Sequence, residues 1–129
     1  MLPEALLEPL RRSGYEPQVS AEGGMICVLI PGYRLPEGYL PATTDLLLRL
    51  PAGFPEVPPD MFWVDPPVAF ARTGAAPAAT ELRETYLGRV WQRFSRHLAP
   101  GSWRPGCDSL QSYLSLLHTD LARDAAAHG

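Results

Sequence analysis

The chain has 129 residues, of which 46% are hydrophobic and 19% charged, as expected for one soluble globular domain with a single core. Its formal net charge of −3, without a basic run, argues against nucleic acid as the main partner. Apolar runs such as 25–30 are too short to span a bilayer, so we expect no membrane partner.

The N-terminus and the cysteines both favour a cytoplasmic protein. The first residues lack a basic stretch followed by an apolar segment, so we expect no secretion signal. The chain has two cysteines, Cys27 and Cys107, which do not form a disulfide framework, and a reducing compartment is the simpler expectation.

Lysine is absent, and all 11 basic residues are arginine. A GC-rich genome favours arginine, alanine and proline codons and explains this bias most simply. A functional explanation is also open. An enzyme that carries an activated acyl group gains from having no side-chain amines of its own to acylate.

The N-terminal half predicts one helix and three strands. A short helix is expected over 3–12, where leucines recur at helical spacing. Strands are expected over 25–30, 43–50 and 60–64, which are apolar runs bounded by Gly or Pro. The prolines of 51–59 cannot donate enough backbone hydrogen bonds for a central strand, so a rigid extended loop is predicted there, with Asp60 at its end.

The C-terminal half predicts one clear helix. Residues 71–80 are rich in Ala and Gly and are expected to be mobile, whereas 82–94 are irregularly amphipathic and fit a helix or a strand. Asp108, with Gln111 three residues later, is the expected N-cap of a helix that ends in a frayed tail over 122–129. The chain is therefore predicted as one α+β domain over 1–129, with three to four antiparallel strands and helices on one sheet face.

Two sequence blocks occur in a distinctive order. Residues 46–59 read LLLRLPAGFPEVPP, and Ser95 lies eight residues before the turn Trp103-Arg104-Pro105. This order resembles the ubiquitin-conjugating-enzyme (UBC-like) superfamily over about 43–117. In that family a strand ending in Pro precedes Tyr/Phe-Pro-x-x-Pro-Pro, and a catalytic cysteine lies eight residues ahead of Trp-x-Pro.

The chain departs from the family at the site itself. Ser95 stands in the place of the cysteine, and the family's His-Pro-Asn motif, whose Asn helps stabilise the oxyanion, is missing; the nearest sequence is Asp65-Pro66-Pro67. The chain therefore looks more like the divergent bacterial branch. Those proteins are encoded beside a ubiquitin-like protein, an adenylating activating enzyme and often a JAB-type metalloprotease.

The resemblance implies a function and its partners. The chain would accept the C-terminus of a ubiquitin-like protein from an activating enzyme and transfer it to an amine, without a metal or an organic cofactor. The N-terminal helix, the proline loop and the Trp-x-Pro turn would dock partners. The residues implied are Leu6, Arg11, Arg12, Phe54, Pro58, Pro59 and Trp103.

A serine nucleophile needs help that a cysteine does not. Its hydroxyl forms almost no alkoxide at neutral pH, so it requires a general base or strong activation. His97 shares a face with Ser95 if the segment is extended and is the predicted base or oxyanion donor. Arg96 is predicted to supply positive potential to the oxyanion. The product would be an oxyester, which is less prone to aminolysis than a thioester.

Other interpretations stay open. The chain could be a noncatalytic UBC variant that binds a ubiquitin-like protein or an activating enzyme, or an RWD-like scaffold unconnected to acyl transfer. Cys107 lies beyond Trp103, on the wrong side of the turn for the family's nucleophile, and Cys27 is expected in the core. Glu84 is expected on a solvated face, and the scattered histidines give no metal signature.

Overall fold

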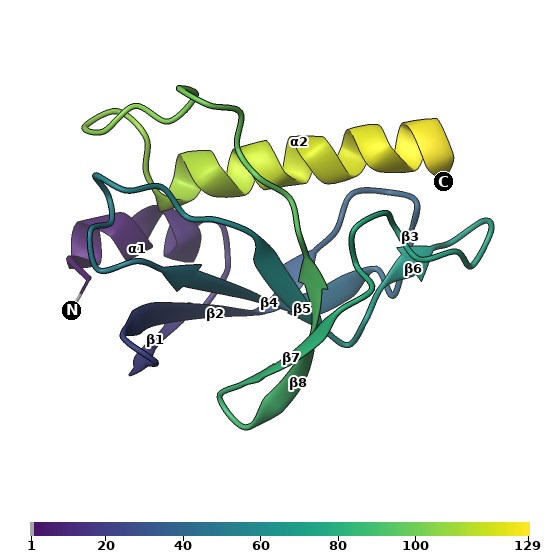
Figure 1. The fold of residues 1–129 in the computed structure, drawn as a ribbon, viewed down its shortest axis with the longest axis horizontal. Coiled ribbons are helices and arrows are strands. Elements are labelled where there is room, and N and C mark those ends of the chain that lie inside the picture. Colours follow the sequence, from purple (N-terminus) through teal and green to yellow (C-terminus); the bar gives the residue numbers. More distant parts are fainter. Residues whose placement is uncertain (1) are drawn as a thin grey trace.

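Two helices cover one face of a six-stranded antiparallel sheet in the computed structural model, which describes residues 2–129 (Figure 1). The helices are α1 (Glu4–Arg12) and α2 (Leu110–His128). In spatial order the sheet contains β1 (Gln18–Glu22), β2 (Met25–Arg34), β4 (Thr43–Leu50), β5 (Phe62–Asp65), β8 (Arg89–Phe94) and β7 (Arg83–Tyr86). A separate two-stranded sheet pairs β3 (Tyr39–Leu40) with β6 (Ala69–Phe70).

The predicted α+β class and the order of helix, antiparallel sheet and helix are confirmed. The predicted number of strands, three to four, is lower than the number observed. Strand β1 was missed because its sequence, QVSAE, is mostly polar. The β7–β8 hairpin was left undecided because its turn, Leu87-Gly88, lacks the usual Asn or Asp. Both turn residues have positive φ, 54° and 72°, as a tight hairpin turn requires. No helix within residues 2–129 is long and apolar enough to cross a membrane.

The period-two alternation of the strands divides the buried side chains between the two sheet faces. On the helix face, Phe62 of β5 and Phe94 of β8 stack with ring centroids 4.7 Å apart, within the main core. On the opposite face, Cys27, Leu47, Trp63 and Trp91 form a second cluster, and none of them is more than 3% exposed. Cys27 is therefore a core residue, as predicted.

The expected N-cap of α2 was wrong by one residue. The cap is Ser109, whose hydroxyl accepts a hydrogen bond from the Ser112 backbone N–H at 3.3 Å, while Ser112 Oγ accepts from the Ser109 N–H at 2.8 Å. The Asp108 carboxylate instead accepts from the Arg104 N–H and from Ser112 Oγ. Asp and Ser are comparable caps, so the sequence alone does not choose between adjacent candidates.

The tail expected to fray is helical, since α2 continues to His128. Leu121 is buried in the main core, Asp124 pairs with Arg96, and Arg72 Nε donates to the Gly129 carbonyl at 2.8 Å. These contacts and the alanine content stabilise the last turns. The expected mobility of 71–80 stays a prediction. That segment begins directly after β6, and Pro77 within it is buried.

We expect Ser109→Ala to lower the free energy of unfolding by about 1 kcal/mol, because one α2 backbone N–H loses its capping partner. Urea denaturation measures the change. Gln111→Ala is the matched control, since Gln111 is exposed in the same turn and should leave the midpoint unchanged. Equal losses in the two variants would contradict the capping assignment.

Candidate functional site

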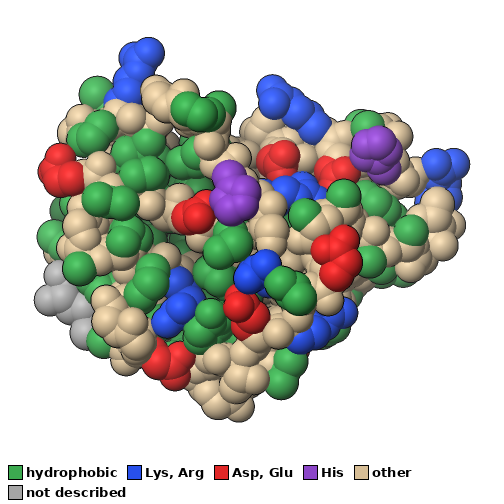
Figure 2. Space-filling view, viewed as in Figure 1, with side chains coloured by type: hydrophobic (Ala, Val, Ile, Leu, Met, Phe, Trp, Pro, Cys, Tyr) green, Lys and Arg blue, Asp and Glu red, His purple; other side chains and the backbone are tan. Residues whose placement is uncertain are grey.

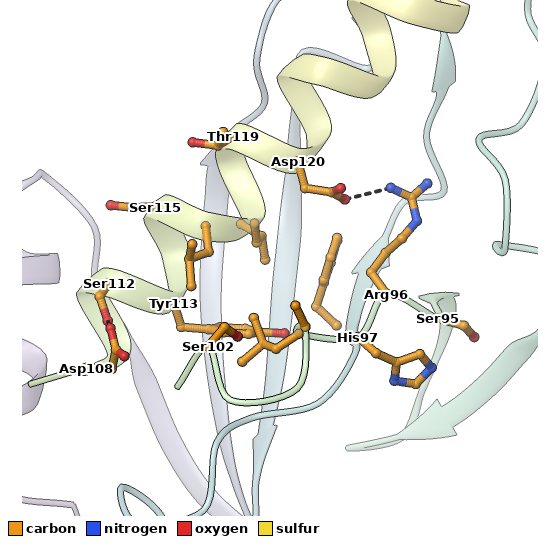
Figure 3. A pocket seen from close by; sticks show the side chains of 15 residues that line it. Ser95, Arg96, His97, Ser102, Asp108, Ser112, Tyr113, Ser115, Thr119 and Asp120 are labelled. Carbon is orange, nitrogen blue, oxygen red and sulfur yellow. Dashed lines mark hydrogen bonds and ion pairs between the residues drawn. The ribbon is translucent and has the colours of Figure 1, made fainter. Parts of the chain in front are cut away.

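A hollow of about 830 Å³ lies between the segment after β8 and helix α2 (Figure 3). Its floor is apolar and includes Phe62, Tyr113 and Leu117, while hydroxyl groups and carboxylates line its rim. Ser95, Arg96 and His97 all contribute to the lining, so the structure brings the three predicted catalytic residues to one side of the hollow. Over the face in Figure 2, acidic and basic side chains are interspersed.

Ser95 is half-buried and directly follows the last residue of β8. Its backbone N–H donates to the Ala79 carbonyl at 3.0 Å, which fixes the chain at this point. Its Oγ accepts a hydrogen bond from Arg93 Nε at 3.0 Å. The hydroxyl points away from α2 (Figure 3), so the oxygen lies outside the main core.

Arg93 is held by Glu84, which is held in turn by Trp63. Its Nη1 lies 3.3 Å from Glu84 Oε2 on β7, and the other oxygen of Glu84 accepts from Trp63 Nε1 of β5 at 2.8 Å. Trp63, Glu84, Arg93 and Ser95 therefore form one hydrogen-bonded row on the sheet face opposite α2. Glu84, expected on a solvated face, is 30% exposed and thus partly covered by these neighbours.

His97 pairs with a carboxylate from the proline loop. Its Nδ1 lies 2.6 Å from Asp60 Oδ1, and both side chains are about 60% exposed. Asp60, expected only to end the loop, therefore orients the imidazole. The contact uses Nδ1 and does not involve the other ring nitrogen, Nε2. Among the hydrogen bonds of residues 2–129, Ser95 Oγ has Arg93 as its partner and none joins it to His97.

Arg96 reaches toward α2, as Figure 3 shows. Its guanidinium donates to Asp120 at 2.7 Å, to Asp124 at 2.9 Å and to the Ala78 carbonyl at 2.9 Å. Burial lowers the pKa of Arg96, but the hydrogen bonds with Asp124 and Asp120 outweigh it, and the net pKa is raised. The guanidinium is thus charged and engaged away from Ser95, so its predicted oxyanion role finds no contact here and stays a prediction.

The two sequence blocks that carry the family resemblance contact each other. Trp103 Nε1 donates to the Pro55 carbonyl at 2.8 Å, and the Trp103 and Phe54 rings lie 6.1 Å apart. Both side chains are partly buried against the main core. The proline loop and the Trp-x-Pro turn therefore support one another next to the hollow.

The predicted docking residues differ in how much surface they offer. Arg12 is exposed and Pro58 is half-buried, whereas Pro59 is buried, Leu6 packs against the main core and Arg11 pairs with Glu4. Their role in partner binding stays a prediction.

The remaining candidates lie apart from Ser95. Cys107 is exposed in the turn after Pro105, and His118 on α2 bonds through Nδ1 to the Tyr33 hydroxyl at 2.9 Å. In the part of the chain that the structure describes, no three His, Cys, Asp or Glu side chains gather as metal ligands would.

Comparison with known proteins identifies one family. The model of the family described as Prokaryotic E2 family E matches residues 2–124. No curated protein and no solved structure matches the chain.

Proposed function

Because this match covers nearly the whole chain, the protein belongs to prokaryotic E2 family E, and from this premise we propose that Ser95 is its acyl-carrying residue. The family indicates a conjugating transferase in general, one that interacts with a ubiquitin-like protein and an activating enzyme. In our proposal the C-terminus of the ubiquitin-like protein is received from the activating enzyme as an oxyester on Ser95 and is then passed to an amine.

One observation carries this proposal. The Ser95 oxygen lies outside the main core, points away from α2 and accepts a hydrogen bond from a guanidinium, while the residue itself belongs to the lining of a large hollow (Figure 3). A nearby positive charge favours the alkoxide form of a hydroxyl, which is what a serine nucleophile needs. Ser95 lies eight residues before Trp103-x-Pro105, which is the position of the catalytic cysteine in the UBC-like superfamily that the chain resembles.

The loading step is an acyl exchange. Ser95 Oγ attacks the activated carbonyl carbon, the new C–O bond forms, and the donor's leaving group departs with its electron pair. His97 accepts the hydroxyl proton through Nε2, directly or through one water, and Asp60 stabilises the resulting imidazolium. Arg96 positions the segment by tying it to α2.

The expected setting is a bacterial conjugation cascade in a reducing cytoplasm. A JAB-type metalloprotease would cleave the conjugates, as the resemblance to the divergent bacterial branch implies. No metal or organic cofactor takes part in the proposed steps, and no nucleic acid or membrane partner is required.

The test is a reaction of the purified protein with its ubiquitin-like protein, its activating enzyme and ATP. We expect an adduct whose mass equals the sum of the two proteins minus water and which survives denaturation with a thiol reductant. Intact-mass spectrometry detects it. Failure to form any adduct, with active activating enzyme present, would contradict the proposal.

A noncatalytic binding module is the second candidate, and one observation favours it. Ser95 Oγ and His97 are not hydrogen-bonded to each other within residues 2–129, and the Asn of the family's His-Pro-Asn motif has no counterpart. A binding module would copurify with the ubiquitin-like protein or the activating enzyme without any covalent adduct. Ser95→Ala would then leave the amount of copurified partner unchanged.

A further inference from the structure

In the described part of the chain, the guanidinium that contacts the proposed acyl-carrying oxygen belongs to Arg93 rather than to Arg96. Arg93 Nε donates to Ser95 Oγ at 3.0 Å. We infer that Arg93 is a catalytic residue, which stabilises negative charge on the Ser95 oxygen whenever the bond between that oxygen and the acyl group forms or breaks. This inference rests on the proposed function and adds to it a residue that the family motifs do not supply.

The position of Arg93 is set before any substrate binds. Residues 93 and 95 lie on the same side of the extended chain at the end of β8, which brings the two side chains together. Glu84 holds the guanidinium from β7 and is itself fixed by the indole of the buried Trp63. Hydrogen-bond donors that are already in place stabilise developing charge without the cost of reorganisation.

The chemistry explains why such a donor is needed beside a serine. During transfer the acceptor amine attacks the ester carbon, the C–N bond forms and the C–O bond breaks. The electron pair goes to the Ser95 oxygen, which then takes up the proton released by the attacking nitrogen. An alkoxide leaves far less readily than a thiolate, because an alcohol holds its proton more tightly than a thiol. The Arg93 N–H stabilises the leaving oxygen and offsets part of this disadvantage.

The same contact acts during loading. As the Ser95 hydroxyl gives up its proton, the Arg93 N–H stabilises the oxygen that attacks the acyl donor. The hydroxyl hydrogen remains available to a base, because the guanidinium uses only the oxygen's lone pair. Arg93 should therefore affect both the formation of the adduct and its discharge.

The first test compares Arg93→Met with wild type. We expect both the loading rate and the rate of discharge to free lysine to fall by about 100-fold, the loss typical of removing one charge-stabilising donor. Arg83→Met is the matched control, because Arg83 is exposed on the adjacent strand and bonds only to the Thr80 carbonyl among the described residues. Both rates should stay unchanged in that control, and circular dichroism checks that each variant folds.

The second test looks for a new product, which a misfolded variant would not form. The chain has no lysine, so Arg93→Lys places its one side-chain amine beside the ester oxygen. We expect the acyl group to move from the Ser95 oxygen to the new amine, which gives an amide that hydroxylamine does not cleave. Peptide mapping should locate this amide at residue 93, whereas Arg83→Lys should keep a hydroxylamine-sensitive ester.

The outcomes separate the inference from the proposed function. If wild type forms the ester while Arg93→Met reacts at the wild-type rate and Arg93→Lys forms no amide, the role of Arg93 is overturned and the proposed function stands. If wild type itself forms no ester, the proposed function fails, and the role of Arg93 fails with it.

Discussion

Replacement of Ser95 by alanine is expected to reduce the reductant-resistant adduct to about 1% of the wild-type amount or less, as removal of a nucleophile does in other acyl-transfer enzymes. The physical reason is direct, since a methyl group offers no oxygen for the ester. Among residues 2–129 the half-buried side chain has one hydrogen bond, from Arg93, so the fold should tolerate the change. Intact-mass spectrometry of timed reactions measures the adduct.

Two controls make this prediction specific. Ser102→Ala removes an exposed hydroxyl from the lining of the same hollow and should leave the adduct at the wild-type amount. Cys107→Ala should do the same, because that thiol lies in the turn beyond Trp103. A full amount of adduct in Ser95→Ala, together with its loss in Cys107→Ala, would assign the acyl group to the cysteine.

Phe94→Ala is expected to lower the free energy of unfolding by about 3–5 kcal/mol, the range for truncating a buried aromatic side chain. Phe94 is fully buried and stacks on Phe62, so its removal leaves a cavity between β8, β5 and the helices. Since Ser95 follows Phe94 directly, the variant should also lower adduct formation through the loss of folded protein. Urea denaturation gives the stability change.

Val90→Ala is the matched control for Phe94→Ala, because Val90 lies on the same strand but is 58% exposed. We expect the free energy of unfolding to change by no more than about 0.5 kcal/mol in that variant. A loss below about 1 kcal/mol in Phe94→Ala would mean that β8 does not contribute to the main core as described.

The sequence predicted elements best where burial gives a strong pattern. The strand expected over 43–50 has the same bounds as β4, because a run of leucines on alternating faces, ended by Pro51, marks both its length and its end. The hairpin over 83–94 was harder to predict. Its turn residues Leu87 and Gly88 lack the usual Asn or Asp, and Arg89, Gln92 and Arg93 interrupt the apolar pattern of β8.

The sequence indicated two residues of the candidate site through the family resemblance and local spacing, and their catalytic roles stay predictions. Ser95 follows from its spacing to Trp103-x-Pro105, and His97 follows from lying two residues further along. The contacts of Asp60 with His97 and of Glu84 with Arg93 join residues from different strands and loops. No local pattern indicates them, because they arise only when the sheet forms. Arg96 shows the converse, since a residue adjacent to the site in sequence points toward α2.

The most direct measurement compares the chemical sensitivity of the adduct when the Ser95 oxygen is replaced by sulfur. In a Cys107→Ala background, Ser95→Cys should form a thioester that a thiol reductant cleaves within minutes, while the serine protein forms an adduct that resists reductant and yields to hydroxylamine. This result would show that the acyl group is attached to residue 95. Adducts with the same sensitivity in both proteins would place the acyl group elsewhere and contradict the assignment of Ser95.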